Sequence, residues 1–453
     1  MKFFNKLFIL LLFLNLSETY KLILFSWGIP SVVTSVATVV LLLLYILFNL
    51  NTLSVLARVS FFKYWFILVF LIPTVSISIN YFRGNLNETE LTYWLAFNAL
   101  FSFLFVSSAI VAYSVPLKWL VYMVWACVCS TIIGFYVYYA YPDLIRQMGT
   151  LTGNQLAFVV YGSEESRNMS FFDHPNGAAL SIVCYFIFLF TSFVDSTKSI
   201  AFYVFCSALL LAMVSLTGSR TSLVISIALI IVYIRPLIGK IISLNYRHNS
   251  GQVKLIIYAF LTFGVFFGVL LLYLISGSIT SHGFSEVESR YSIFSSLFDP
   301  SKDLKDESLD ERTTIVGVYL KYVSDNILLG YGPVFRDNKI GSGQLKNVSQ
   351  NAYLEGALVY GIFYPIYFIY IKIKTYIAAK NKLYKNHFIF NSLAVFMVFL
   401  FLLSLSVNDI FWNRSIVIVL GLLIGIYIRH RSEKSKVVQP PSKQAQPGYL
   451  ELT

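Results

Sequence analysis

The residues in this sequence best able to do chemistry are arginines that stand beside long apolar stretches. Arg220 is the clearest case, because it lies in SLTGSRTSLV, a short turn with small hydroxyl side chains between two apolar segments. A charge in such a place costs free energy unless it has a partner or a function. A guanidinium can grip a pyrophosphate through paired hydrogen bonds. Pyrophosphate binding is therefore one interpretation of Arg220, and contact with lipid headgroups is the other.

Three more arginines stand near apolar segments on the same expected side of a membrane. They are Arg167, Arg290 and Arg312. Arg167 belongs to ESRNMSFFDHPNGAAL, in which His174 is either a proton carrier or a capping residue at a helix start. Arg290 and Arg312 lie in a long polar segment, where they either bind phosphate or remain solvated loop charges.

Carboxylates and amides at two further membrane boundaries are the other candidates. Gln350, Asn351 and Glu355 lie in VSQNAYLEGALVYG, at the entrance to an apolar segment. A carboxylate one turn inside such a segment is unfavourable alone, so Glu355 either pairs with an arginine or acts as a general base. Asp409, in SVNDIFWNR, is either a general base or a plain turn residue.

Any reaction at these residues must draw its energy from the substrate itself. The sequence has no Walker A loop, Rossmann glycine pattern or HExxH motif, and no DxD motif in an extracytoplasmic segment. Outside the cytoplasm there is no ATP or nucleotide-sugar. A lipid-linked pyrophosphate donor fits: arginines stabilise the departing pyrophosphate, and a carboxylate or imidazole accepts the proton of an acceptor hydroxyl. We expect no metal or other cofactor.

The elements that must position these residues are hydrophobic helices. Of the 453 residues, 57% are hydrophobic and 12% are charged, against roughly 25% charged in soluble domains. The net charge of +12 is concentrated in short connections between apolar segments, which favours membrane orientation over nucleic-acid binding. The sequence therefore predicts an all-α, polytopic integral membrane protein with no nucleic-acid partner.

About twelve apolar segments are long enough to cross a membrane, which takes roughly 20 residues. They cover 6–27, 31–50, 62–79, 93–113, 117–140, 177–195, 199–217, 221–238, 255–276, 354–371, 388–406 and 415–428. The first is expected to be an uncleaved span, although Glu18 and Lys21 interrupt it. The chain then divides into helices 1–9 at 1–277, a large loop at 278–353, helices 10–12 at 354–430, and a disordered tail at 431–453.

The charges of the connections predict the orientation. The connections at 235–254 and 372–387 hold four and five basic residues and no acidic ones, whereas 278–353 holds eight basic residues against ten acidic. Connections rich in lysine and arginine stay in the cytoplasm. We therefore expect both termini in the cytoplasm and the large loop outside.

The large loop carries its own predicted helix. Ser308-Leu-Asp-Glu311 is a capping-box pattern, so a helix should begin near residue 309. Ile315 and Tyr319 belong to an apolar face at helical spacing. Such a helix lies at the membrane interface or packs within an extracytoplasmic subdomain. Glycines in LLGYGP predict a tight turn after it.

Four segments, in this order, resemble the landmarks of the O-antigen ligase and polymerase superfamily. They are RNMSFFDHPNGAAL, LTGSRTSLV, DERTTIVGVYLKYVSDNILLGYGP and QNAYLEGALVYGIF, and they cover roughly 165–365. The resemblance implies a bacterial inner-membrane glycosyltransferase that needs no metal, has one large periplasmic loop, and uses undecaprenyl-pyrophosphate-linked saccharides. It places Arg220 and Arg312 at the family's phosphate-binding arginines, and Asn351 at the Asn of its His-Asn pair.

One residue departs from the ligase pattern. Ligases have a catalytic His before that Asn, whereas this chain has Gln350, which cannot act as a base. The departure favours a polymerase, which joins lipid-linked repeat units, over a ligase, which transfers polysaccharide to the lipid A core. A flippase or other transporter is the alternative from another class, but the two similar halves it would usually show are not visible.

The predicted roles follow from this interpretation. Arg220 and Arg312 would bind pyrophosphates, with Arg167 and Arg290 assisting. The proton acceptor would be one of three residues: Glu355, Asp409 or His174. The expected partners are the undecaprenyl-pyrophosphate-linked oligosaccharide, membrane lipid and, from the family resemblance alone, a chain-length regulator.

Overall fold

The computed structural model describes most of the chain. The described residues are 2–28, 31–141, 144, 170–172, 175–193, 199–245, 307–335, 351–380, 388–405 and 413–438. Every regular element among them is a helix, so the predicted all-α class is confirmed over this part of the chain. The expected span at 255–276 lies outside the described residues.

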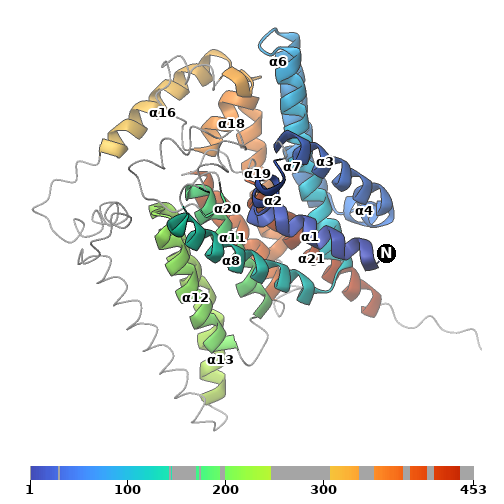
Figure 1. The fold of residues 1–453 in the computed structure, drawn as a ribbon, viewed down its shortest axis with the longest axis vertical. Coiled ribbons are helices and arrows are strands. Elements are labelled where there is room, and N and C mark those ends of the chain that lie inside the picture. Colours follow the sequence, from blue (N-terminus) through green and yellow to red (C-terminus); the bar gives the residue numbers. More distant parts are fainter. Residues whose placement is uncertain are drawn as a thin grey trace, which may run out of the picture.

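Figure 1 shows the described helices, coloured in chain order. In order they are α1 (Lys2–Ser17), α2 (Tyr20–Trp27), α3 (Ser31–Phe48), α4 (Leu50–Ala57), α5 (Ser60–Phe66), the π-helix η1 (Ile67–Leu71), α6 (Ile72–Phe82), α7 (Glu88–Ser114), α8 (Leu117–Ala140), α11 (Pro175–Phe193), α12 (Ser199–Leu216), α13 (Arg220–Asn245), α16 (Glu307–Asp325), α18 (Ala352–Tyr360), α19 (Phe363–Lys380), α20 (Phe388–Ser404) and α21 (Arg414–Val438).

The predicted count of about twelve membrane spans is not confirmed. In the described part of the chain, four helices are long and apolar enough to cross a membrane: Ser60–Phe82, Glu88–Ser114, Leu117–Tyr138 and Arg414–Ser432. A fifth candidate is the pair Ser35–Phe48 and Leu50–Ala57, which is bent by 80°. The expected first span is likewise broken at Glu18, whose backbone has a φ of 56°.

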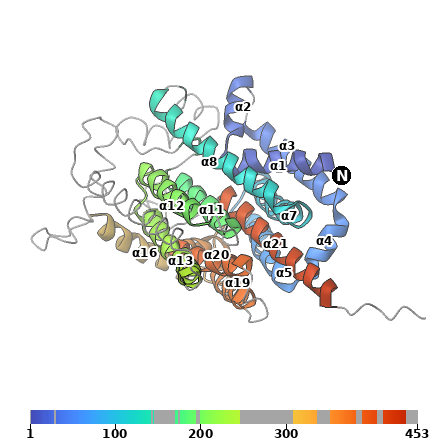
Figure 2. The ribbon, with the colours of Figure 1, turned by 90° about the horizontal axis from the view of Figure 1, so that it is seen from below.

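The centre of the fold is the contact between α7 and α21. Gly421 and Gly425 form a GxxxG pattern on α21, and a Cβ atom on either would lie 2.5 Å from the Phe105 carbonyl oxygen or 2.3 Å from that of Ala109. Small residues at this spacing let two membrane helices approach backbone to backbone. Figure 2 shows α21 running between α12 and α13 on one side and α3 and α4 on the other.

The first and last helices share one end of this bundle. Lys6 of α1 lies 5.7 Å from the ring centroid of Trp119, at the start of α8. Arg429, near the end of α21, donates to the carbonyl oxygens of Ala112 and Val115, at the end of α7. These contacts bring the first turns of α1 and the second half of α21 to the α7–α8 connection. Helix α21 continues to Val438, past the expected end of the last span at residue 428, so residues 431–438 of the expected disordered tail are helical.

The expected tenth span at 354–371 is wrong, because this stretch forms two antiparallel helices. The ring centroids of Tyr353 on α18 and Phe368 on α19 lie 5.8 Å apart. A straight helix rises about 1.5 Å per residue and would place them roughly 22 Å apart. Gly361, with a φ of 85°, supplies the reversal. The chain therefore folds back into a helical hairpin.

The turn that follows α16 is joined to this hairpin through backbone hydrogen bonds. The Tyr331 and Gly332 amides donate to the Leu358 and Val359 carbonyl oxygens at 2.8 and 3.0 Å, and the Ile362 amide donates to Ile327 at 2.8 Å. Gly330 and Gly332 have φ of 65° and 82°, which confirms the predicted tight turn. The two chain reversals hold each other in place.

Helix α16 uses its predicted apolar face to pack on α18. Ile315, Tyr319 and Val323 are buried against Ala357 and Leu358 of α18. The helix begins at Glu307, two residues before the predicted start. Whether α16 lies at the membrane interface, on the rim of the bundle or within an extracytoplasmic subdomain stays a prediction. Figure 1 shows α16 and α18 together above α11, α12 and α13.

Candidate functional site

Helices α11 and α21 begin side by side. A Cβ atom on Gly177, in the first turn of α11, would lie 4.0 Å from the side-chain nitrogen of Asn413. Asn413 directly precedes α21, and its side-chain oxygen accepts from the Ile416 amide at 3.2 Å. Two helix N-termini therefore lie together at one end of the bundle, which we call the site end.

Helix α13 begins at the same end. The ring of Phe190 on α11 lies 5.1 Å from Tyr233 on α13, and these residues are similarly far from the starts of their helices. The two helices consequently run parallel with their starts nearly level. Helix α12, which lies between them in sequence, runs the other way, and Tyr203 donates to the Ile230 carbonyl oxygen across the α12–α13 hairpin.

Arg220 is the first residue of α13. The turn before it contains Gly218, with a φ of 64°. Ser219 and Ser222 are buried, and their hydroxyl oxygens are 3.0 Å apart. The predicted tight turn with small hydroxyl residues is therefore present, and Arg220 stands at a helix N-terminus at the site end.

The start of α18 reaches the site end through three side chains. The Lys372 ammonium of α19 donates to the Tyr353 hydroxyl at 2.6 Å and to the Ser404 hydroxyl at 3.0 Å. Ser404 is the last residue of α20. The first turn of α18 thus lies level with the end of α20, the helix that precedes α21 in the chain.

Asn351 is the N-cap of α18, a role that the sequence analysis did not assign to it. Its side-chain oxygen accepts from the Tyr353 and Leu354 amides at 3.0 and 3.1 Å, as a good N-cap does. Glu355 lies in the first turn and is 3% exposed. A carboxylate there is favoured by the positive end of the helix dipole. Both predicted roles of Glu355, ion pairing and proton acceptance, remain compatible with this position.

Arg312 lies in α16, one turn before Ile315, which is buried against α18. The structure therefore brings the helices of Arg312, Asn351 and Glu355 into direct contact. The remaining predicted site residues lie outside the described residues: Arg167, His174, Arg290, Gln350 and Asp409. In sequence, His174 directly precedes α11, and Asp409 falls between α20 and α21.

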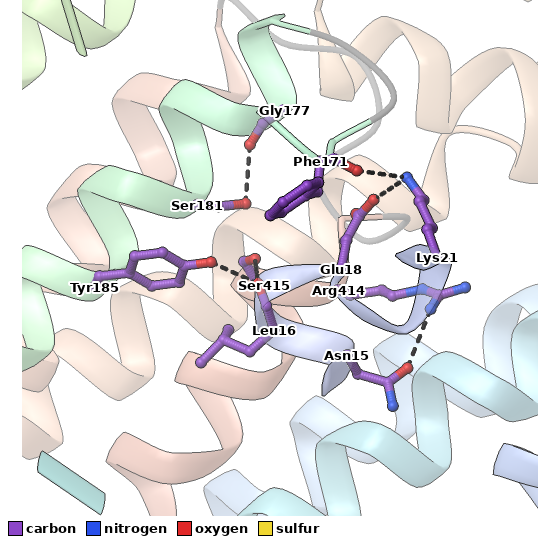
Figure 3. Close-up of polar contacts among 10 residues, drawn as sticks. All are labelled: Asn15, Leu16, Glu18, Lys21, Phe171, Gly177, Ser181, Tyr185, Arg414 and Ser415. Carbon is purple, nitrogen blue, oxygen red and sulfur yellow. Dashed lines mark hydrogen bonds and ion pairs between the residues drawn. The ribbon is translucent and has the colours of Figure 1, made fainter. Parts of the chain in front are cut away.

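Sequence reasoning missed a polar cluster at the site end, shown in Figure 3. Glu18 and Lys21 form an ion pair at the break between α1 and α2. The Lys21 ammonium also donates to the Phe171 carbonyl oxygen at 3.1 Å. Arg414, the first residue of α21, donates to the Asn15 side-chain oxygen at 3.1 Å. In the sequence, this cluster could have been recognised from Glu18 and Lys21, two opposite charges three residues apart within an apolar segment.

The same cluster joins three helices through one carbonyl oxygen. The Tyr185 hydroxyl of α11 donates to the Leu16 oxygen at 2.6 Å, and the Ser415 hydroxyl of α21 donates to it at 3.2 Å (Figure 3). The break at Glu18 frees carbonyl groups at the end of α1, and buried carbonyls need such partners. The cluster therefore anchors α1 to the middle of α11 and to the start of α21.

The turn after α16, which contacts the end of α18 away from its first turn, holds a tyrosine that stays protonated. Burial and the negative charge of Asp325 raise the pKa of Tyr331, and the positive charge of Arg83 lowers it less. Tyr331 stacks on Phe335 with ring centroids 4.1 Å apart. A phenol with a raised pKa is a hydrogen-bond donor at neutral pH, so Tyr331 is not a candidate general base.

Four helix N-termini at one end make a favourable place for a negatively charged group. Unpaired amides and the positive ends of the helix dipoles both favour anions. Among the described residues, no three His, Cys, Asp or Glu side chains lie close enough together to hold a metal ion.

Comparison with known families agrees with this arrangement. Residues 205–369 match the family model described as O-antigen ligase. The matched segment contains three of the four landmark segments, with Arg220, Arg312 and Asn351, and it confirms the resemblance over this part of the chain. No curated protein matched the chain.

The O-antigen ligase match supports a glycosyltransferase-like enzyme with a role in lipopolysaccharide biosynthesis. Together with the apolar helices, it indicates a membrane protein. The elements outside the matched segment also reach the site end, since α11, α21 and the α1–α2 break all lie there.

Proposed function

We propose that this protein is an O-antigen or related surface-polysaccharide polymerase. It would transfer a growing chain from its undecaprenyl pyrophosphate carrier to the next lipid-linked repeat unit. The reaction would take place at the periplasmic face of the bacterial inner membrane, with both termini in the cytoplasm. A regulator of chain length is the protein partner that we would expect.

The observation that supports this proposal is the meeting of helix N-termini at the site end, with Arg220 at the start of one of them. A pyrophosphate leaving group gathers negative charge as its bond to the sugar breaks. Fixed amides and guanidinium groups stabilise that charge without having to reorganise. Arg220 and Arg312 would bind the pyrophosphates, with Arg167 and Arg290 assisting.

The acceptor hydroxyl must lose a proton as it attacks the sugar. Glu355, Asp409 and His174 are the candidates: Glu355 lies in the first turn of α18, His174 directly precedes α11 in the sequence, and Asp409 falls between α20 and α21 in the sequence. Glu355 is the candidate with a described side chain, and it is buried in the first turn of α18. We propose a proton-accepting role for one of these three residues.

A ligase is the second candidate function. It is supported by the description of the matched family. Gln350 argues against a ligase. The resemblance gives ligases a catalytic His directly before the Asn that matches Asn351, and the amide of Gln350 cannot act as a base in its place. A flippase or other transporter is a third candidate, and two similar halves, which would support it, are not seen in the sequence.

A deletion strain distinguishes the three candidates on a lipopolysaccharide gel. Loss of a polymerase leaves lipid A core capped with a single repeat. Loss of a ligase leaves naked core while lipid-linked polymer accumulates. Loss of a flippase leaves naked core and no periplasmic polymer.

Arginine variants then test the site itself. R220A and R312A should each abolish long chains at normal protein level, because each removes a pyrophosphate contact. Normal chain length in both variants would refute the assigned site. R220K should restore little activity, since an ammonium lacks the paired geometry of a guanidinium.

A further inference from the structure

Lys372 is a buried amine that no part of the proposed reaction uses. It lies in the middle of α19 and is 3% exposed. Its ammonium donates to the hydroxyls of Tyr353 and Ser404. It also lies 3.5 Å from the ring centroid of Phe368 and 5.5 Å from that of Phe401.

The surroundings of Lys372 are unusual for a buried charge. In the part of the chain that the structure describes, no carboxylate lies within ion-pair distance of it. Removing an ammonium from water costs several kcal/mol of free energy. Contacts with aromatic rings and two hydroxyls recover only part of this free energy. A methionine of similar length would fill the space without this cost. Packing alone therefore does not account for a lysine.

The contact with Tyr353 gives the lysine a definite mechanical consequence. Tyr353 lies in the first turn of α18, two residues from Asn351 and two from Glu355. The opposite end of α18 is already held, since Leu358 and Val359 accept backbone hydrogen bonds from Tyr331 and Gly332. At its other end, the first turn of α18 is attached by the Lys372 hydrogen bond and by the ring contacts of Tyr353 with Phe368 and Phe401.

The same side chain also contacts the end of α20. The Ser404 hydroxyl accepts from Lys372 and donates to the Leu400 carbonyl oxygen, so it is fixed at the end of α20. Asp409 follows five residues later. One ammonium therefore joins the start of α18 to the helix end from which the Asp409 segment leaves.

We propose that Lys372 is a positioning residue that holds the first turn of α18, with Asn351 and Glu355, against the end of α20 in the reacting geometry. The proposal rests on the proposed glycosyl transfer at this site. Lys372 does not touch the substrate; it acts through Tyr353 and Ser404. Small displacements of reacting groups cost large factors in rate, which would explain why a costly buried charge is present.

Two variants remove the connection from either side. K372M keeps the length of the side chain but removes the donors, and Y353F removes only the acceptor oxygen. K374M is the matched control, because Lys374 is exposed and lies two residues further along the same helix. Rates are measured with purified protein in nanodiscs and lipid-linked repeat units extracted from the polymerase-deficient parent strain.

Positioning predicts a specific kinetic pattern. K372M and Y353F should each lower kcat by about tenfold or more with little change in KM. The double variant should be no slower than the single variants, because both remove one connection. K374M should keep wild-type kcat. A K372M protein with wild-type kcat, or a double variant whose losses multiply, would overturn the proposal.

Amide hydrogen exchange provides a readout that does not depend on the reaction. K372M and Y353F should speed exchange about fivefold or more in residues 353–356, and leave residues 358–362 unchanged, because local opening follows the lost attachment. Unchanged exchange at 353–356 in both variants would overturn the proposal whatever the activity. Full activity in R220A and R312A, with faster exchange in K372M, would instead refute only the proposed function.

Discussion

A Cβ atom on Gly361 would lie 2.1 Å from the carbonyl oxygen of Leu328, so the turn of the α18–α19 hairpin leaves no room for a side chain. The closest neighbours are backbone atoms, which cannot move aside as a flexible side chain can. The hairpin presents the start of α18 to the site, so its turn affects both folding and function.

The first prediction concerns this turn. G361A should lower the free energy of unfolding by about 3 kcal/mol, because a non-glycine residue is strained at positive φ and its Cβ overlaps the Leu328 backbone. Thermal unfolding in detergent measures the change. G317A is the control: Gly317 lies in α16 with open space around it, so alanine should be neutral or slightly stabilising there. Equal melting temperatures for the two variants would contradict the described turn.

The second prediction concerns the contact between α7 and α21. G425A should destabilise the protein by about 2 kcal/mol, because its Cβ would press on the Ala109 carbonyl oxygen at 2.3 Å. G177A should have a much smaller effect, since its Cβ would meet only the Asn413 side chain at ordinary contact distance. Comparing the two melting temperatures checks the prediction. A G425A protein as stable as G177A would mean that α7 and α21 are not in close backbone contact.

The third prediction separates a cap at the site from a cap elsewhere. N351A removes hydrogen bonds to two amides and should lower polymer formation, because the first turn of α18 loosens. N87A removes the capping box of α7, where Asn87 and Glu90 exchange hydrogen bonds. Each loss should cost about 1 kcal/mol of stability. Chain length on a lipopolysaccharide gel should fall for N351A and not for N87A. An equal fall for N87A would show that the effect comes from lower stability and not from the position of Asn351 at the site.

The fourth prediction concerns the ion pair at the α1–α2 break. E18Q and K21M should each destabilise the protein by about 3 kcal/mol, because each leaves one charge without its partner in a largely buried place. The double variant should be less destabilised than the sum of the two, since neither charge is then left alone. A double-mutant cycle of melting temperatures tests this. Strict additivity would show that Glu18 and Lys21 do not depend on each other.

Several features of this protein followed from the sequence because they depend on local chemistry. The apolar composition required helices, since backbone groups in a membrane must be satisfied within one segment. The glycines at 330 and 332 predicted a turn, the SLDE pattern predicted a helix near 309, and the small hydroxyl residues around Arg220 marked a tight connection. All three are present in the structure. The resemblance to the O-antigen ligase family likewise rested on ordered local segments, and the match at 205–369 bears it out.

Other features depended on contacts between distant residues, which hydropathy does not record. The stretch 354–371 is apolar enough to suggest one span. In the structure the chain reverses at Gly361, and backbone hydrogen bonds with residues 327–332 stabilise the reversal. Glu18 and Lys21 looked like flaws in a first span until Phe171 and the starts of α11 and α21 came beside them. From the sequence, Lys372 counts among the basic residues of a cytoplasmic connection. In the structure it is buried, because the α18–α19 hairpin brings Tyr353 next to it. Sequence determines which local conformations are cheap, but partners from elsewhere in the chain decide which charges and which breaks in helices are stable.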